Sequence, residues 1–259
     1  MTDELLFDVR DGVARVVFNR PHARNALTFA MYERLAEVCA EVDADRGVRA
    51  MVLTGAGDKA FAAGTDIAQF RAFGSAEDAL VYEARIDRVL SALERCRVPT
   101  IAAVAGACTG GGCAIAAVCD LRIAAQGARF GFPIARTLGN CLSVSSLSRL
   151  SALIGPARVK DIVFTARLLD AGEALAAGLV GEVLPDADAL SARADALAAL
   201  VASHAPLTML ATKEGLRRLR DGGPGADGAD LVAMCYTSND FREGMEAFLA
   251  KRPAQWTGT

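Results

Sequence analysis

Segments with strand-type and helix-type apolar patterns alternate along roughly the first 185 residues, and this alternation constrains the fold most strongly. Residues 5–10 and 13–18 have the pattern of two strands joined by the turn pair Asp11–Gly12. Later segments alternate between short apolar runs and the 3.6-residue spacing of helices. Further strands are predicted at 48–53, 100–105 and 121–125, and helices at 28–43, 76–96, 113–118, 143–153 and 156–165. This order predicts an α/β core.

The remainder of the chain has only helical patterns. Apolar periodicity predicts helices at about 189–203, 207–220, 229–236 and 240–251, with a flexible glycine-rich loop at 221–230. We therefore divide the chain into an α/β core that carries the site, residues 1–195, and a helical C-terminal region, residues 196–259.

Composition and charge exclude several classes of protein. With 259 residues, of which 53% are hydrophobic and 23% charged, the chain can bury a large core and is not disordered. Its 28 Lys and Arg against 31 Asp and Glu lack the basic excess of a nucleic-acid binder. The acidic start has no signal-peptide pattern, and the weakly polar stretch 100–119 is too rich in glycine and alanine for a membrane span. We expect a cytoplasmic protein without nucleic-acid or membrane partners.

The cysteines and histidines give no sign of a disulfide framework or a metal site. The seven cysteines are an odd number and none has CxxC spacing, which indicates reduced thiols. The two histidines, His22 and His204, belong to no HxxxH or HExxH motif, so we expect no metal.

Two segments of small residues, each at a strand-to-helix junction, are candidates for chemistry. In KAFAAGTDI (59–67), Asp66 can cap a helix, and neighbouring backbone N–H groups can bind an anion or a developing oxyanion. In VAGACTGGGC (104–113), each glycine of the GGG run costs about 1 kcal/mol in a helix, so a ligand or close packing must require it. The run has neither the spacing nor the lysine of a P-loop. From the residues alone, an ordinary capped loop and simple helix packing remain open.

Together these segments resemble the crotonase superfamily, also called the enoyl-CoA hydratase/isomerase family. The resemblance extends from about residue 5 to residue 252. Its other motifs are Asn19-Arg20-Pro21, Asn25-Ala26-Leu27, VLTG (52–55), Cys119-Asp120, FTAR (164–167), AGLV (177–180) and NDFREGMEAF (239–248). It implies a crotonase-like spiral of ββα turns with a helical C-terminal region that forms trimers or hexamers.

The resemblance also implies acyl thioesters of coenzyme A as substrates, with CoA as part of the substrate and no separate cofactor. The backbone N–H groups of Thr65 and Gly111 would form an oxyanion hole for the thioester carbonyl. Preorganised donors at an enolate oxygen can be worth about 3–4 kcal/mol each. By family position, the substrate and CoA contacts would be Arg24, Lys59, Ala63, Asp66 and Ile67, with Phe248 and Lys251 from a neighbouring subunit.

The family's hydratases use two glutamates as acid and base, because water adds as a proton and a hydroxide. At the matching positions this sequence has Ala114 and Ile134, neither of which can move a proton. The resemblance therefore implies a lyase or isomerase of the family for which ordinary hydratase activity is doubtful. The loop that follows offers Arg136, Cys141 and Ser143 as replacement groups.

Three hypotheses remain open. In the first, an enzyme with a changed catalytic set binds a substrate carboxylate at Arg136 and decarboxylates the substrate, with Cys141 or Ser143 as proton donor. Alternatively, Arg136 forms a surface or inter-subunit ion pair, and Cys141 is a buried small hydrophobic residue. In the second, a hydratase or isomerase takes its carboxylates from elsewhere on the chain. Those candidates are Asp66, Glu83 and Asp87, which otherwise serve as a helix cap and solvated helix faces. In the third, the chain is a non-catalytic acyl-CoA-binding or assembly protein.

Overall fold

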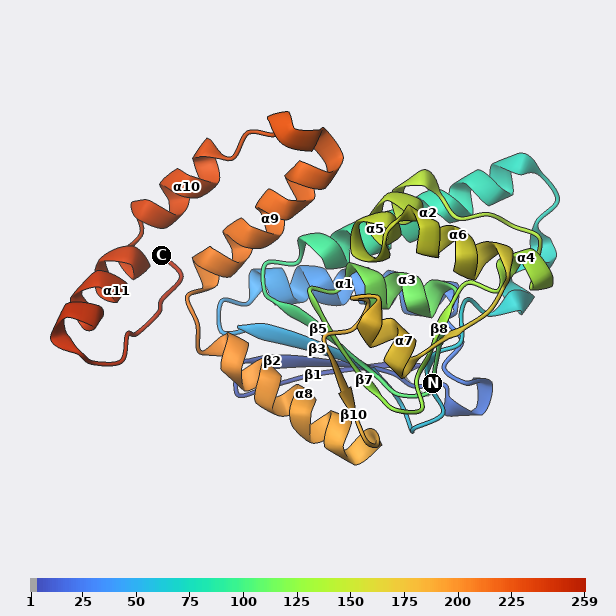
Figure 1. Cartoon of the computed structure of the whole chain (residues 1–259), viewed down its shortest axis with the longest axis horizontal. Helices are drawn as coiled ribbons and strands as arrows, with labels where there is room; N and C mark the ends of the chain where they lie inside the picture. The colour runs from blue at the N-terminus through green and yellow to red at the C-terminus, as the bar shows by residue number, and fades with distance from the viewer. Residues whose placement is uncertain (1–3) are drawn as a thin grey trace.

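The computed structural model describes residues 4–259 and shows an α/β core with a helical arm (Figure 1). Six strands in these residues form the larger sheet, in the order β1-β2-β3-β5-β7-β10. They are β1 (Leu5–Arg10), β2 (Val13–Phe18), β3 (Ala50–Gly55), β5 (Thr100–Val104), β7 (Leu121–Ala125) and β10 (Glu182–Leu184). Only the first pair is antiparallel within this sheet. The predicted hairpin is confirmed at both of its strands.

A smaller sheet of four short strands lies beside the first, in the order β4-β6-β8-β9. They are β4 (Ala60–Ala62), β6 (Ala107–Thr109), β8 (Arg129–Gly131) and β9 (Leu169–Asp170). The sequence does not predict these strands, because two or three residues show no periodicity. Strands β4, β6 and β8 each follow a strand of the larger sheet and precede a helical segment. The chain thus repeats a ββα turn, which confirms the predicted fold class.

The helices follow the predicted segments closely. They are α1 (Phe29–Ala44), α2 (Ala76–Arg95), α3 (Gly111–Val118), α4 (Ile134–Thr137), α5 (Val144–Ile154), α6 (Pro156–Phe164), α7 (Ala171–Ala176), α8 (Ala187–Ala202), α9 (Pro206–Gly222), α10 (Ala229–Tyr236) and α11 (Asn239–Ala250), with short 3₁₀ turns η1 (Pro21–Ala23), η2 (Ile67–Ala72) and η3 (Gly223–Gly225). The Thr28 side chain caps α1 by accepting from the Met31 N–H. Asp170 and Glu173 form a capping box at the start of α7.

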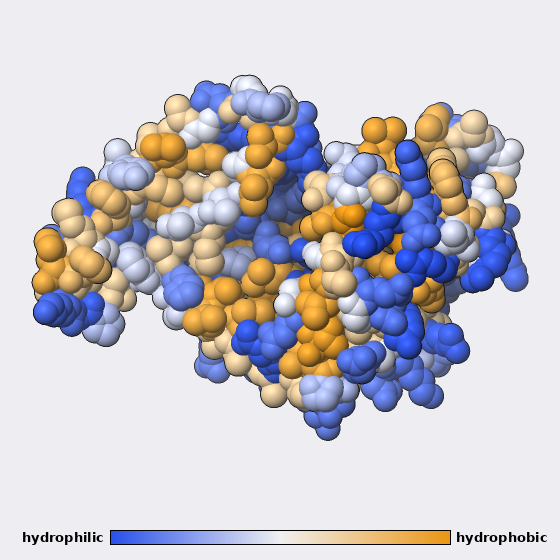
Figure 2. Space-filling view, in the orientation of Figure 1, coloured by the Kyte–Doolittle hydropathy of each residue, from blue (hydrophilic) through white to orange (hydrophobic). Residues whose placement is uncertain are grey.

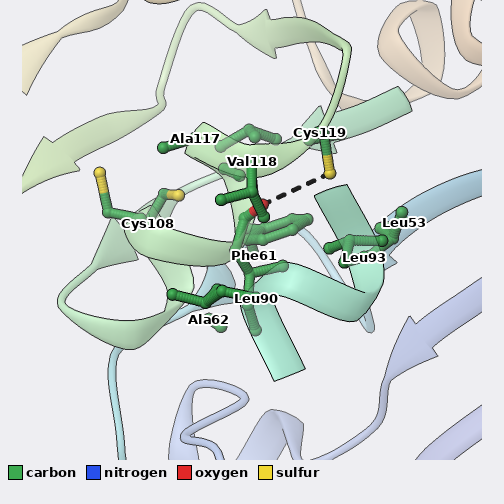
Figure 3. Packing of buried hydrophobic residues seen from close by; sticks show 14 of the residues in the cluster. Leu53, Phe61, Ala62, Leu90, Leu93, Cys108, Ala117, Val118 and Cys119 are labelled. Carbon is green, nitrogen blue, oxygen red and sulfur yellow. Dashed lines mark hydrogen bonds between the residues drawn. The ribbon is translucent and has the colours of Figure 1, made fainter. Parts of the chain in front are cut away.

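The main core lies between the larger sheet and helices α1, α2 and α3. Figure 3 shows its centre, where the Phe61 ring packs among Leu53, Leu90 and Leu93. Helix α8 covers the other face of the sheet through a second apolar cluster that includes Leu190. These two clusters fix the strand ends from which the site loops emerge.

Helices α9, α10 and α11 form an arm that projects from the core (Figure 1). The predicted boundary between residues 195 and 196 lies within α8, and the division into two regions stays a prediction. The first three residues of the predicted core lie outside the described residues. No single helix among residues 4–259 is long and apolar enough to cross a membrane; α8 and Pro206–Gly225, bent by 103°, reach that length and composition only as a pair.

A buried asparagine ties the loop before α1 to the chain that leads into β4. The amide of Asn25, 1% exposed, donates to the carbonyls of Ala56 at 3.1 Å and Ala60 at 2.7 Å. Its side-chain carbonyl accepts from the backbone N–H of Arg20 at 3.0 Å. Three backbone groups therefore depend on one side chain for their hydrogen bonds.

We predict that Asn25→Ala lowers the free energy of unfolding by about 1–3 kcal/mol, because buried backbone groups lose their partners. Urea denaturation measures this change. Asn239→Ala is the control, since Asn239 is exposed and its side chain donates to the Thr259 hydroxyl at 3.2 Å. Equal unfolding midpoints for the wild type and Asn25→Ala would contradict the assigned role.

Candidate active site

The loop before α1 pairs with the loop that follows β4. The Leu27 N–H donates to the Gly64 carbonyl, and the Asp66 N–H donates to the Leu27 carbonyl, both at 2.8 Å. The Ala63 N–H donates to the Arg24 carbonyl at 3.1 Å. Leu27 and Thr65 form a parallel β-bridge. Its hydrogen bonds use the groups on either side of Thr65, and the Thr65 N–H does not take part in them. The Thr65 N–H therefore points away from the segment that carries Leu27.

The glycine run at the start of α3 packs directly on this loop. A Cβ atom on Gly112 would lie 2.2 Å from the Ala62 carbonyl oxygen, and one on Gly110 would lie 3.5 Å from the Gly64 Cα. Gly110 also has a φ of 51°. Close packing and backbone conformation thus account for two of the three glycines.

The third glycine, Gly111, is the first residue of α3. The first N–H groups of a helix have no partner within it, and they lie at the positive end of the helix dipole. A Cβ atom on Gly111 would lie 3.2 Å from the Thr65 Oγ1 atom. The structure therefore brings together the two residues predicted to form the oxyanion hole.

Two tyrosines hold the Thr65 side chain through its hydroxyl. The Thr65 hydroxyl lies 2.9 Å from the Tyr32 hydroxyl and 2.9 Å from the Tyr82 hydroxyl. Tyr32 is 1% exposed, and its hydroxyl would lie 2.0 Å from a Cβ atom on Gly111. Burial raises the pKa of both tyrosines, which keeps their hydroxyls neutral.

Sequence reasoning missed Tyr32 and Tyr82, although a signal existed. The chain has three tyrosines, and these two lie on the apolar faces of predicted helices. A buried tyrosine hydroxyl needs a hydrogen-bond partner, so two such residues indicate a polar point inside the core.

Asp66 has a local structural role next to the oxyanion loop. Its carboxylate accepts from the Ala68 N–H at 3.0 Å and pairs with Arg20 at 3.0 Å. The Ala68 hydrogen bond and then the Arg20 charge lower the pKa of Asp66. A carboxylate held in this way caps η2 and is a weak proton acceptor at neutral pH.

The other predicted binding residues surround this loop at its surface. Arg24 and Lys59 are exposed, Ala63 is half-buried, and Ile67 is 60% exposed. The Lys59 carbonyl accepts from the Ala107 N–H at 3.0 Å, which places the start of β4 beside β6. Two cationic side chains therefore flank the loop that carries Thr65.

Apolar groups occupy the two positions matched to the family's glutamates. Ala114 is half-buried and lines a small cavity with Leu90 and Ser146. Ile134 is 8% exposed and belongs to the main core. Their correspondence to the glutamate pair stays a prediction.

The segment after β8 carries the three residues predicted to replace the glutamates in catalysis, and their surroundings differ. Arg136 and Cys141 are exposed, and no described side-chain contact involves either residue. Ser143 caps α5 by accepting from the Ser146 N–H at 3.2 Å, so its hydroxyl has a structural task. A carboxylate-binding role for Arg136 and a proton-donor role for Cys141 stay predictions.

The structure does not bring Phe248 and Lys251 to the site within one chain. Phe248 lies on α11 and is 83% exposed, and Lys251 is the exposed residue that ends this helix. Helix α11 lies at the opposite end of the molecule from α4 (Figure 1). Their predicted contacts require a second subunit.

Comparisons with known proteins agree with this geometry. A sequence model of the family described as enoyl-CoA hydratase/isomerase matches residues 8–259. The chain is 34% identical to the crotonyl-CoA hydratase of Syntrophomonas wolfei, over 98% of each chain. It is also 34% identical to the short-chain-enoyl-CoA hydratase of Clostridium acetobutylicum, over 96% of each. A crystal structure from Magnetospirillum magneticum, described as an enoyl-CoA hydratase/carnithine racemase, superposes with a TM-score of 0.92 at 35% identity, covering 100% of this chain and 97% of that one.

The three hydroxyls of Thr65, Tyr32 and Tyr82 form a cluster whose contribution to stability can be measured. We predict that Thr65→Val, which keeps the side-chain shape, lowers the free energy of unfolding by about 1–3 kcal/mol because buried tyrosine hydroxyls lose their partner. In a Tyr32→Phe/Tyr82→Phe background, Thr65→Val should lower the free energy of unfolding by much less. Urea denaturation of these variants and of Thr208→Val, an exposed control, measures the difference. An equal cost in both backgrounds would show that the hydroxyls do not interact.

Proposed function

This chain belongs to the enoyl-CoA hydratase/isomerase family, and we propose that it binds acyl thioesters of coenzyme A and stabilises their enolates at the Thr65 and Gly111 amides. One observation carries the proposal: the loop ending at Thr65 packs against the glycine run at the start of α3. This contact places two backbone donors from different ββα turns beside each other. Relatives named as crotonyl-CoA and short-chain-enoyl-CoA hydratases support the thioester substrate.

The chemistry of a thioester explains why such donors matter. Removal of a proton next to the carbonyl leaves negative charge on the carbonyl oxygen. Two N–H groups already fixed by the fold stabilise this charge without reorganising, and losing one donor of this kind costs about 10²–10³ in kcat. Because backbone atoms supply both donors, the threonine side chain at position 65 is free to bond the two tyrosines.

The exposed cations near the loop suit the rest of the substrate. CoA carries phosphate groups, which Arg and Lys side chains bind as charge partners. We propose Arg24 and Lys59 for this task, because both are exposed beside the Thr65 loop. CoA enters as part of the substrate, and the proposed chemistry uses no separate cofactor.

We also propose that the chain associates with copies of itself through the arm. Large apolar side chains are exposed on α9, α10 and α11; they include Leu216, Leu219, Val232, Tyr236, Met245, Phe248 and Leu249. Figure 2 shows apolar side chains along the arm and a hollow between the arm and the core. A cleft of about 730 Å³ lies between α9 and the core. Exposed apolar surface of this extent indicates a protein interface.

A trimer, or a hexamer built from two trimers, would cover this surface. It would also bring Phe248 and Lys251 of one subunit to the thioester site of another, where the family resemblance places them. Self-association and substrate binding are then linked.

The oxyanion assignment predicts the effect of removing one N–H group. A Cβ atom at Gly111 would meet the Tyr32 hydroxyl, so the test uses a Tyr32→Phe background. There, Gly111→Pro, which lacks the N–H, should lose about 10²–10³ in turnover or proton exchange of acyl-CoA relative to Gly111→Ala, which keeps it. Circular dichroism verifies the fold of both. Equal rates would remove Gly111 from the mechanism.

The arm predicts the oligomeric state. Light scattering after size exclusion should give a mass near three or six times the 27.0 kDa of one chain. Phe248→Asp/Leu249→Asp should shift the protein toward monomer, because charges replace two apolar contacts. Phe164→Asp on the core is the control, since Phe164 is also exposed, at 76%. A monomeric wild type would contradict the proposal.

A further inference from the structure

Helix α2 carries a carboxylate that the structure leaves without a partner. Glu83 is half-buried, and within residues 4–259 no hydrogen bond or ion pair holds its side chain. Three other acidic residues of the same helix are bound: Asp78 belongs to the capping box, Asp87 pairs with Arg149 and Glu94 pairs with Arg220. The fifth, Glu77, is exposed to solvent on the first turn. Burial partly desolvates this unpaired carboxylate, and perturbed carboxylates of this kind concentrate at functional sites.

Helix α2, which carries Glu83, reaches two parts of the proposed site: Thr65 and the cavity beside Ala114. Its neighbour Tyr82 reaches Thr65 through the 2.9 Å hydroxyl contact. One and two turns further along α2, Asp87 and Leu90 continue the Glu83 face of the helix. Leu90 shares a small cavity with Ala114, where the family resemblance places a catalytic glutamate. The helix face that carries Glu83 therefore borders, at Leu90, a cavity whose lining residues include no carboxylate.

The electrostatic surroundings agree with this placement. Burial, and then the charge of Asp87, raise the pKa of Glu83 above its ordinary value. The Glu83 charge in turn contributes to the raised pKa of Tyr32 on α1 and of Tyr82, so it lies near both hydroxyls. From α5, Ser145 donates to Asp87 at 2.6 Å and Arg149 pairs with it at 2.7 Å. Asp87 is thus fixed as a charge beside Glu83.

We propose that Glu83 is the catalytic base of this chain, and that it moves protons on the thioester held by Thr65 and Gly111 so that a double bond shifts. This inference rests on the proposed function. The carboxylate takes a proton from the α-carbon of a β,γ-unsaturated acyl thioester. The C–H electron pair becomes part of the dienolate, whose negative charge lies on the thioester oxygen.

The second half of the reaction restores the carboxylate. The Glu83 acid delivers a proton to the γ-carbon, the dienolate electrons return from oxygen, and the product is the conjugated α,β-unsaturated thioester. No atom is added, and nothing is oxidised or reduced. Hydration would need a second group to activate water, whereas a single carboxylate that takes and returns a proton suffices for isomerisation.

Two assays on the full-length protein test this inference. Mass spectrometry follows deuterium incorporation into butyryl-CoA in D₂O, and absorbance of the conjugated thioester follows conversion of 3-butenoyl-CoA to crotonyl-CoA. Glu83→Gln should lower both rates by about 10²-fold or more, because general-base catalysis contributes that much. The affinity for butyryl-CoA, measured by calorimetry, should stay within about threefold. Glu77→Gln, on the exposed first turn of α2, is the matched control and should match the wild type.

The pH profile separates a base from a merely structural residue. The exchange rate should fall as pH drops through the raised pKa of Glu83. Asp87→Asn removes the nearby negative charge that raises this pKa, so the midpoint should move to lower pH.

Each other outcome overturns the inference in a distinguishable way. Equal exchange by wild type and Glu83→Gln would leave the proposed function standing and remove Glu83 as the base. Tight binding of butyryl-CoA by the wild type without exchange or isomerisation would keep thioester binding and exclude proton transfer. Absence of binding would remove the proposed function and this inference together.

Discussion

The close approach of two backbone segments is the constraint on which the site depends. A Cβ atom on Gly112 would collide with the Ala62 carbonyl oxygen at 2.2 Å, whereas one on Gly110 would touch the Gly64 Cα at 3.5 Å. Only glycine allows β4 of one ββα turn to lie directly under the helix start of the next. The contact costs helix propensity at Gly111 and Gly112, the first two residues of α3, and the surrounding core offsets that cost. Without this close contact, the Thr65 and Gly111 amides would not lie beside each other.

Buried polar side chains then hold in place the two backbone segments that the glycines allow to meet. Asn25 ties the first loop to the chain before β4, and Tyr32 and Tyr82 hold the Thr65 hydroxyl. Each of these groups lies in or beside the apolar core, where an unpaired hydrogen-bonding group is destabilising. The same bonds that stabilise the fold therefore orient the donors, so stability and preorganisation are linked in this chain.

Sequence patterns predicted the long elements, and the family resemblance pointed to Thr65 and Gly111, which the structure places close together. Helices α1 and α2 and the first hairpin have clear periodicity, and the GGG run stands out because propensity disfavours it. The short strands β4, β6, β8 and β9 escaped prediction, because pairing with each other defines them and no local pattern does. Tyr32 and Tyr82 escaped for a similar reason: their partner, Thr65, comes from a distant segment. Glu83 was one of several candidate carboxylates, and only the bonded state of Asp66 and Asp87 separates it from them.

The central claim is that two fixed amides polarise a thioester carbonyl, and isotope-edited infrared spectroscopy tests it directly. Butyryl-CoA labelled with ¹³C at the carbonyl would be bound to the wild-type protein and compared with the free compound. The account predicts that the labelled C=O stretch moves to lower frequency on binding, and that this shift shrinks in Tyr32→Phe/Gly111→Pro relative to Tyr32→Phe/Gly111→Ala. A bound carbonyl with the frequency of the free thioester would contradict the account.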